Sequence, residues 1–308
     1  MMRLDERFLT GSYPPLVTPF RNGVVDFDAY SELVERQIAG GSDGIVVAGT
    51  TGEPSSLRIS ERKQLLETAI RTARRRIPVV ASTGSQSYEE TADLTSHADK
   101  AGADAVLVVT PYYIRPSQQG MVEYFVSIAA LTSLPVLIYH IPGRAAVSIT
   151  TPTVQKIADR AGNLVGIKHA ATDLDIITEL LARLGKEFRV FCGLEALSLP
   201  MLVVGASGVM NAVGNLDPAR VAALCKAVRD RDLDTARKLH FDLFELSRAI
   251  FLDTNPVPLK YMMSRLGLLQ TNEVRLPLLT ISDRERQDVL DHVLAEAGLL
   301  TGVKETIA

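Results

Sequence analysis

Short apolar runs alternate with longer amphipathic stretches along most of this chain. Eight such runs lie at residues 13–18, 44–48, 78–81, 105–109, 135–139, 165–168, 190–192 and 208–210. Most neighbouring runs are about 25 to 35 residues apart, which fits one buried strand followed by one returning helix. The pattern therefore predicts regular alternation of β-strands and α-helices.

The stretches between the runs begin with helix-start signals. Ser87 and Glu90 have the spacing of a capping box, and Asp217-Pro218 offers a capping carboxylate followed by a proline suited to a first helical turn. Comparable signals open three other stretches, at Asp28, Ser60 and Asp173.

Eight strand–helix units predict an α/β fold, a closed (β/α)8 TIM barrel. A doubly wound open sheet is the alternative, but eight units exceed its usual count of about five or six strands. After Arg231 the strand pattern stops, and residues 233–246, 258–266 and 283–297 have helical periodicity. We therefore expect a barrel carrying the active site over residues 1–231 and a C-terminal helical domain over residues 232–308.

Composition narrows the class of partner. The 308 residues carry a net charge of -3, which gives no reason to expect nucleic acid or an anionic membrane surface as a partner. No apolar run approaches the length of a membrane span. Cys192 and Cys225 have neither metal-type spacing nor a disulfide framework. We therefore expect a cytoplasmic protein that acts on small molecules.

Lys168 is the most informative single residue, because it closes the apolar run that begins at Val165. The other lysines fall in stretches rich in polar residues. A lysine at the end of a buried strand directs its amine into a cleft, where burial favours the neutral form. A neutral amine attacks ketones and aldehydes to form a Schiff base. A strand-terminal lysine that merely reaches solvent is the alternative.

The loop after the second apolar run, Gly49-Thr50-Thr51-Gly52-Glu53, offers hydroxyl and backbone N–H donors together. Such donors suit a carboxylate or a phosphate, although an ordinary strand-to-loop turn is the alternative. The segment is not a P-loop, which requires a lysine after the second glycine.

The ends of the fifth and sixth runs add further polar side chains. Tyr139 is expected at the barrel mouth beside Lys168, where its phenol would exchange protons with an imine, and Arg144 would bind a carboxylate at the rim. A core tyrosine and a surface arginine are the alternatives. His140 and His169 follow Tyr139 and Lys168 directly, so strand alternation turns them toward the helical shell. We therefore predict no metal site.

These motifs together resemble the family of dihydrodipicolinate synthase and N-acetylneuraminate lyase. The resemblance covers residues 13–300 and rests on five segments: the loop at 49–53, Thr110-Pro111-Tyr112-Tyr113 with residues 115–118, Tyr139 with Pro142 and Arg144, Gly166-Ile167-Lys168, and the segment from Asn255 to Lys260. It implies a (β/α)8 barrel with C-terminal helices.

The resemblance also implies a role for each site residue. Lys168 forms a covalent imine with pyruvate, so no cofactor and no metal is required. Tyr139 relays protons, and Thr50 links it to Tyr113, which a neighbouring subunit lends in a homodimer or homotetramer. Thr50 and Thr51 hold the pyruvate carboxylate, and the other expected substrate-binding residues are Gly52, Arg144, Gly193 and Met210.

The second substrate distinguishes the branches of the family. Arg144 favours aspartate semialdehyde and lysine biosynthesis, because the family's equivalent arginine holds that carboxylate. Departures from the common synthase pattern, expected near the pocket rim, leave a related aldolase, lyase or dehydratase acting on a 2-keto-3-deoxy or other 2-oxo acid as the alternative. They are His140, Ala145, Leu194 with Glu195, and Asn211 to Val213.

Two hypotheses come from other classes. A non-catalytic barrel that only binds a 2-oxo acid would show binding without turnover, whereas a metal-dependent aldolase would lose activity on chelation.

The resemblance further implies a lysine effector site near the loop at 49–53. Ile59 and Arg62 stand where some inhibited members carry histidines, so we expect insensitivity to lysine.

Overall fold

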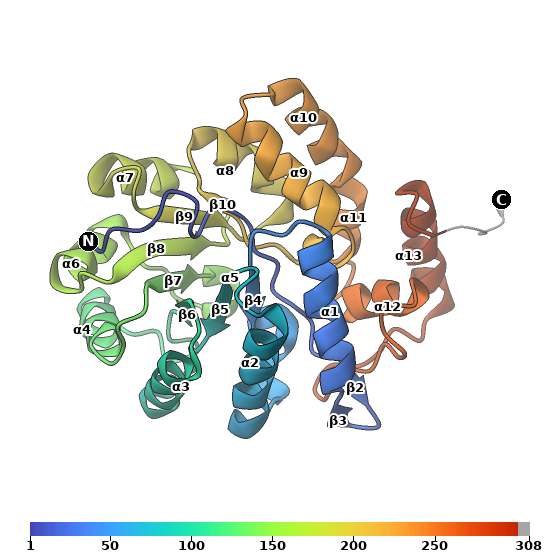
Figure 1. The fold of residues 1–308 in the computed structure, drawn as a ribbon, viewed down its shortest axis with the longest axis horizontal. Helices are drawn as coiled ribbons and strands as arrows, with labels where there is room; N and C mark the ends of the chain where they lie inside the picture. The colour runs from blue at the N-terminus through green and yellow to red at the C-terminus, as the bar shows by residue number, and fades with distance from the viewer. Residues whose placement is uncertain (301–308) are drawn as a thin grey trace.

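Eight parallel strands form the centre of the molecule, a computed structural model that describes residues 1–300 (Figure 1). They pair in the order β1-β10-β9-β8-β7-β6-β5-β4, and an isolated bridge between Pro15 and Val46 joins the two ends. The predicted TIM barrel is confirmed. The strands are β1 (Gly11–Ser12), β4 (Ile45–Val47), β5 (Val79–Ser82), β6 (Ala105–Val109), β7 (Val136–His140), β8 (Leu164–His169), β9 (Arg189–Cys192) and β10 (Gly208–Val209).

Helices surround these strands, as Figure 1 shows. They are α1 (Phe27–Ala39), α2 (Ile59–Ala73), α3 (Tyr88–Ala101), α4 (Gln118–Ala129), α5 (Pro142–Ala145), α6 (Thr151–Arg160), α7 (Asp175–Leu184), α8 (Ser198–Val204) and α9 (Pro218–Arg229). The expected caps form at Ser87 and Asp217, whose side chains accept backbone N–H groups of the first turn. Helix α1 begins at Phe27, because Asp26 caps it rather than Asp28, which lies two residues further along the chain.

The first strand differs from the prediction. We expected residues 13–18, but β1 covers Gly11–Ser12 and only single contacts follow. Pro14 and Pro15 have no N–H group, so this stretch cannot form a full ladder. Instead the Pro14 carbonyl accepts the Val46 N–H, and the Leu16 N–H donates to the Val46 carbonyl, both at 3.0 Å. A small hairpin that the pattern did not predict follows, formed by β2 (Phe20–Arg21) and β3 (Val24–Val25).

Helices alone follow α9 within the described residues. They are α10 (Leu233–Asp242), α11 (Phe244–Ala249), α12 (Val257–Arg265) and α13 (Arg284–Glu296). The helix expected over residues 233–246 is divided at Leu243, where α10 ends and α11 begins. Helices α12 and α13 lie beyond α1 at one side of the barrel (Figure 1). Residues 301–308 of the expected C-terminal domain lie outside the described residues.

The strands separate two apolar cores. Side chains such as Val46, Leu107, Leu137 and Phe191 form a small cluster inside the barrel, and a much larger cluster fills the space between strands and helices. Because side chains alternate along a strand, each strand end presents one residue to the lumen and the next to the helical shell. This alternation places the polar side chains of the site.

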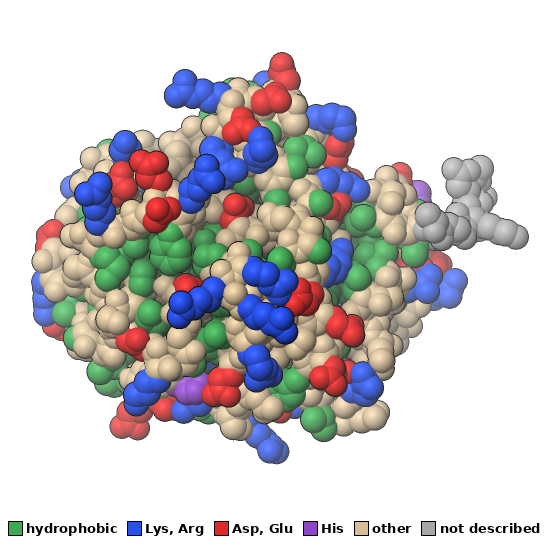
Figure 2. All heavy atoms as spheres, viewed as in Figure 1, with side chains coloured by type: hydrophobic (Ala, Val, Ile, Leu, Met, Phe, Trp, Pro, Cys, Tyr) green, Lys and Arg blue, Asp and Glu red, His purple; other side chains and the backbone are tan. Residues whose placement is uncertain are grey.

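The surface carries both charge signs. Figure 2 shows lysine and arginine side chains interspersed with aspartate and glutamate over the face in view. No helix among residues 1–300 has the length and hydropathy that a bilayer crossing requires.

Candidate active site

Lys168 and Tyr139 lie side by side at the C-terminal ends of β8 and β7. The two residues are register partners, and both are only 4% exposed. The Lys168 amine lies 4.2 Å from the centroid of the Tyr139 ring. Strand pairing thus holds an amine over the face of a phenol ring, within a barrel mouth that excludes most water.

Thr50 connects Tyr139 to the loop at 49–53. The Thr50 hydroxyl lies 3.3 Å from the Tyr139 hydroxyl, within hydrogen-bonding distance. Thr50 opens the short helix η1 (Thr50–Gly52), whose Gly52 N–H donates to the Gly49 carbonyl at 2.8 Å. The Gly52 N–H, one of the backbone donors of this loop, is therefore used inside the turn.

Gly193 and Met210 complete the lumen around Lys168. A Cβ atom at Gly193 would lie 2.9 Å from Cε of Lys168 and 2.8 Å from the Ala170 side chain, so only glycine leaves room for the lysine. Met210 is fully buried in the lumen cluster, and its N–H donates to the Cys192 carbonyl. These two residues confine the amine rather than offering it a charged partner.

A cavity of about 740 Å³ opens beside this cluster. Thr50, Tyr139 and Arg144 line it together. Arg144 lies on α5, is exposed, and forms no salt bridge with a described residue. Its guanidinium is therefore available to an anionic group at the mouth of the cavity.

Tyr113 stands apart from the other expected site residues. It is 83% exposed, and its backbone has a φ of 74°, a conformation that non-glycine residues rarely adopt. Its N–H donates to the Ala145 carbonyl, which ties the loop to α5. The described residues of this chain do not join Tyr113 to Thr50.

The departures from the synthase pattern do not all lie at the rim, contrary to our expectation. Of His140, Ala145, Glu195 and Asn211, only Ala145 lines the cavity. Glu195 is buried and accepts the Ala212 N–H at 2.6 Å, and burial raises the pKa of its carboxyl. Side chains turned away from the cavity have little influence on which aldehyde enters it.

His140 and His169 face the helical shell, as strand alternation predicts. Their Nδ1 atoms lie 3.1 Å apart, and both rings are buried. Burial lowers the pKa of His140 to about 4, and the neighbouring His169 is a second, smaller cause. Burial also lowers the pKa of His169. Both rings are therefore neutral near pH 7, and one donates to the other. Within residues 1–300 no cluster of three His, Cys, Asp or Glu side chains fits a metal ion.

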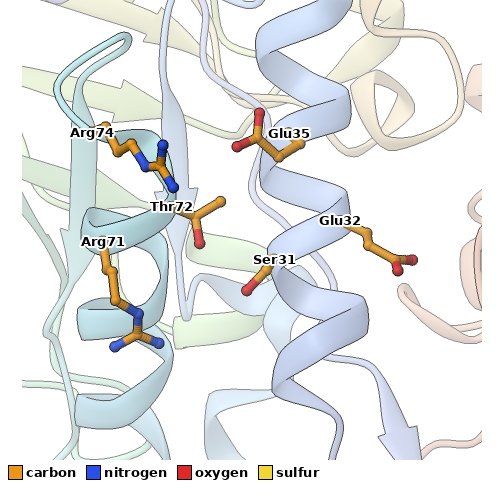
Figure 3. Close-up of a pocket in the computed structure, with 6 residues that line it drawn as sticks. All are labelled: Ser31, Glu32, Glu35, Arg71, Thr72 and Arg74. Atoms are coloured by element: carbon orange, nitrogen blue, oxygen red, sulfur yellow. The ribbon is translucent and has the colours of Figure 1, made fainter.

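A second hollow, of about 560 Å³, lies between α1 and α2 on the outside of the barrel (Figure 3). Glu32 points away from it, and none of its lining residues is buried. Glu35, on its α1 side, already pairs with Arg76. This groove is a solvated contact between two helices.

Sequence reasoning missed the residues that support the loop at 49–53 from the C-terminal helices. Lys260, which we placed in a polar stretch, is fully buried and donates to Glu53 at 2.6 Å. The Asn255 amide donates to the Thr51 hydroxyl at 3.0 Å. The apolar residues around Lys260, Val257 and Leu259, are the signal that its segment is buried.

Fold and site define the class of protein: a (β/α)8 barrel enzyme with a buried lysine at the carboxyl ends of its strands. The model of the dihydrodipicolinate synthetase family matches residues 8–296. The chain belongs to this family and is therefore a lyase.

Individual relatives agree with this assignment. The chain is 45% identical to 4-hydroxy-tetrahydrodipicolinate synthase of Thermus thermophilus over 296 residues, covering 96% of this chain and 98% of the relative. The crystal structure of dihydrodipicolinate synthase from Aquifex aeolicus has a TM-score of 0.92 and 38% identity, covering 95% of this chain and all of that one. The enzyme from Acinetobacter baumannii complexed with pyruvate has a TM-score of 0.91 and 34% identity, covering 95% and 100% of the two chains.

Proposed function

We propose that this chain condenses pyruvate with aspartate semialdehyde to 4-hydroxy-tetrahydrodipicolinate, a step of lysine biosynthesis, through an imine on Lys168. The observation that carries the proposal is the buried Lys168 amine held 4.2 Å from the Tyr139 ring, with the Thr50 hydroxyl on the phenol. The relatives named for this synthase, and the relative complexed with pyruvate, support the choice of substrates.

The chemistry follows from the amine. Lys168 adds to the C2 carbonyl of pyruvate, and loss of water leaves a protonated imine. This cation withdraws electrons from the methyl group, which loses a proton to give an enamine. The enamine carbon then forms a bond to the aldehyde carbon, whose oxygen takes up a proton and becomes a hydroxyl. The amino group of the former semialdehyde then adds to the imine carbon and displaces the Lys168 amine, which closes the ring of the product. Tyr139 moves the protons, and Thr51 and Arg144 hold the two carboxylates.

The imine itself is the electron sink, so the proposed reaction uses no cofactor and no metal. Activity should be unchanged by a chelator.

We also propose that the enzyme works in the cytoplasm as a homodimer or homotetramer with Tyr113 shared across an interface. Support comes from the two buried free cysteines and from the exposure of Tyr113.

Trapping tests the covalent step. Incubation with pyruvate, reduction with borohydride and mass spectrometry should place the adduct on Lys168. Lys168→Ala should remove the adduct while thermal unfolding stays cooperative. Lys226→Ala is the control, because Lys226 lies on the surface of α9 and pairs with Asp230, so the adduct should persist in this variant. An adduct on another lysine would contradict the mechanism.

A turnover assay tests the second substrate. With pyruvate fixed, aspartate semialdehyde should be used in preference to several aldehyde precursors of 2-keto-3-deoxy acids. Preference for one of the latter would move the chain to another branch of the family. Binding of pyruvate with no turnover of any aldehyde would favour a non-catalytic barrel.

A further inference from the structure

Asn255 contacts the proposed pyruvate-binding loop from outside the barrel. It lies just before α12, and its side-chain amide donates to the Thr51 hydroxyl at 3.0 Å. Asn255 is 7% exposed and Thr51 only 2%, so water has little access to this bond. A hydroxyl has a single hydrogen to donate, although it accepts readily. If Thr51 accepts a hydrogen bond from Asn255, the hydrogen of the Thr51 hydroxyl remains free to donate to another group.

A carboxylate accepts hydrogen bonds and donates none. If the Thr51 hydroxyl donated to the Asn255 oxygen, it would present only lone pairs to a pyruvate carboxylate. With the Asn255 nitrogen donating, the Thr51 hydrogen is free for the carboxylate. The structure has this second arrangement, and the Asn255 oxygen has no hydrogen-bond partner among the described residues.

The position of Asn255 is fixed by its neighbours. Five residues further on, the Lys260 amine donates to Glu53 at 2.6 Å and lies 4.2 Å from the centroid of the Phe20 ring. The second oxygen of Glu53 accepts the Arg275 N–H at 3.2 Å. A buried, fully paired carboxylate of this kind anchors the loop firmly against α12. Asn255 therefore meets Thr51 at a fixed distance.

We propose that Asn255 is a positioning residue that sets the hydrogen-bond polarity of Thr51, so that the Thr51 hydroxyl donates to the carboxylate of pyruvate. This inference rests on the proposed function, in which Thr51 holds that carboxylate. A purely structural role, in which Asn255 only fills space beside the loop, makes different predictions for its variants.

Asn255→Asp separates the two roles, because it keeps the shape of the side chain and removes the donor. The Thr51 hydroxyl then donates to the new carboxylate and is lost to the substrate. The KM for pyruvate should rise about tenfold or more, the effect of one hydrogen bond to a charged group. At saturating pyruvate, kcat should change less than about threefold, since the contact is expected to be lost equally from the ground state and the transition state. A structural role predicts that Asn255→Asp is milder than Asn255→Ala; polarity control predicts the reverse.

Two further variants control for the charge that Asn255→Asp adds and for a failure of the variant to fold. Asn255→Leu has a similar shape and neither donor nor charge, and should raise the KM for pyruvate about fivefold with an intact thermal transition. Thr18→Val is the matched control, because Thr18 supports the same loop through the Gly52 carbonyl at 2.7 Å without touching Thr51. It should lower stability while changing the KM less than either Asn255 variant.

Thr51→Val tests the role of Thr51 in carboxylate binding separately from the role of Asn255. It should raise the KM for pyruvate, and adding Asn255→Leu should then have little further effect, because Asn255 is proposed to act on pyruvate only through the Thr51 hydroxyl. An unchanged KM in Thr51→Val would overturn the carboxylate assignment together with this inference. A raised KM in Thr51→Val with an unchanged KM in the folded Asn255 variants, or with fully additive effects, would overturn the role of Asn255 alone.

Discussion

At the scale of single residues, the site depends on which face of a strand each side chain occupies. Tyr139 and Lys168 face the lumen, and their immediate successors His140 and His169 face the shell. The same two strand ends thus carry the proposed catalytic pair on one side and a neutral histidine pair on the other. The two pairs should respond differently to substitution and to pH.

Arg144 should act on the second substrate alone. Arg144→Ala is expected to weaken the use of aspartate semialdehyde by about 2 to 4 kcal/mol in transition-state binding, because a charged contact to a carboxylate is lost. Imine formation with pyruvate should stay nearly intact. Steady-state kinetics with borohydride trapping measure the two half-reactions separately. An equal loss in both would mean that Arg144 supports the pocket rather than the aldehyde.

The histidine pair should make the fold sensitive to acid. The pKa of His140 is lowered to about 4, so between that value and its ordinary 6.5 the unfolded chain binds more protons than the folded one. Stability is therefore complete above pH 6.5 and falls as the pH drops toward 4, by roughly 3 kcal/mol for a shift of this size. Urea unfolding at pH 7, 6 and 5 measures this slope.

His140→Asn should flatten the slope, because the amide keeps a donor and an acceptor but does not titrate. His292→Asn is the matched control, since His292 lies on the surface and pairs with Glu296. Parallel pH profiles for the wild type and His140→Asn would show that the buried pair does not control acid stability.

At the scale of elements, α2 should determine the response to lysine. Arg62 lies on α2, is buried, and donates to the Ser82 and Gly84 carbonyls. Burial lowers the pKa of Arg62 to about 10, which leaves it charged near neutral pH. This fixed cation lines the same cavity as Ile59, the other position where some inhibited members carry a histidine, and Glu90 and Tyr112 also line that cavity.

We therefore expect no inhibition by about 5 mM lysine at subsaturating pyruvate. Ile59 offers no hydrogen bond and Arg62 repels an ammonium group, and two lost contacts of about 1.5 kcal/mol each weaken binding by more than a hundredfold. Initial rates with increasing lysine measure this. Saturable inhibition would show that the site accepts lysine despite these two residues.

Elements built from local patterns could be predicted from the sequence, and those that depend on distant partners could not. The apolar run before Lys168 predicted β8, and Asp217-Pro218 predicted the start of α9. The first strand ends before the predicted residues 13–18, because Pro14 and Pro15 keep the run apolar but have no N–H group to complete a ladder. The domain boundary at residue 231 stays a prediction.

The same limit applies to the candidate site. Lys168, Tyr139 and Thr50 follow from strand ends and the family resemblance, and the structure brings them together. The partnership of Lys260 with Glu53 joins residues 207 positions apart, and no local pattern indicates it. The apolar neighbours of Lys260 indicate that its segment is buried, but they do not indicate its partner.

At the scale of the whole molecule, the exposure of Tyr113 fits the proposal that a neighbouring subunit lends this residue to the site. Tyr113 and Ile114 are 83% and 61% exposed on a loop with unfavourable backbone geometry. If a neighbouring subunit lends Tyr113, Tyr113→Phe should lower kcat by about a hundredfold, the usual size of a proton-transfer contribution, without changing the assembly. Sedimentation and steady-state rates measure both.

Subunit mixing tests the sharing directly. Lys168→Ala and Tyr113→Phe subunits are each expected to be nearly inactive. After they are dissociated together and reassembled, mixed dimers should contain one complete site each, restoring about a quarter of wild-type activity. Formation of mixed dimers without any recovery would show that each subunit uses its own Tyr113.

The ties from Asn255 to Thr51 and from Lys260 to Glu53 also bear on how the enzyme is made. They span 204 and 207 positions, so their second partners leave the ribosome only when most of the chain has been synthesised. Contacts of such separation form late, because the loop they close must first be brought together. A nascent chain can therefore assemble its strands and helices before the loop at 49–53, the proposed carboxylate-binding loop, is held in place. Reactive lysine and pyruvate would meet productively only in the finished molecule.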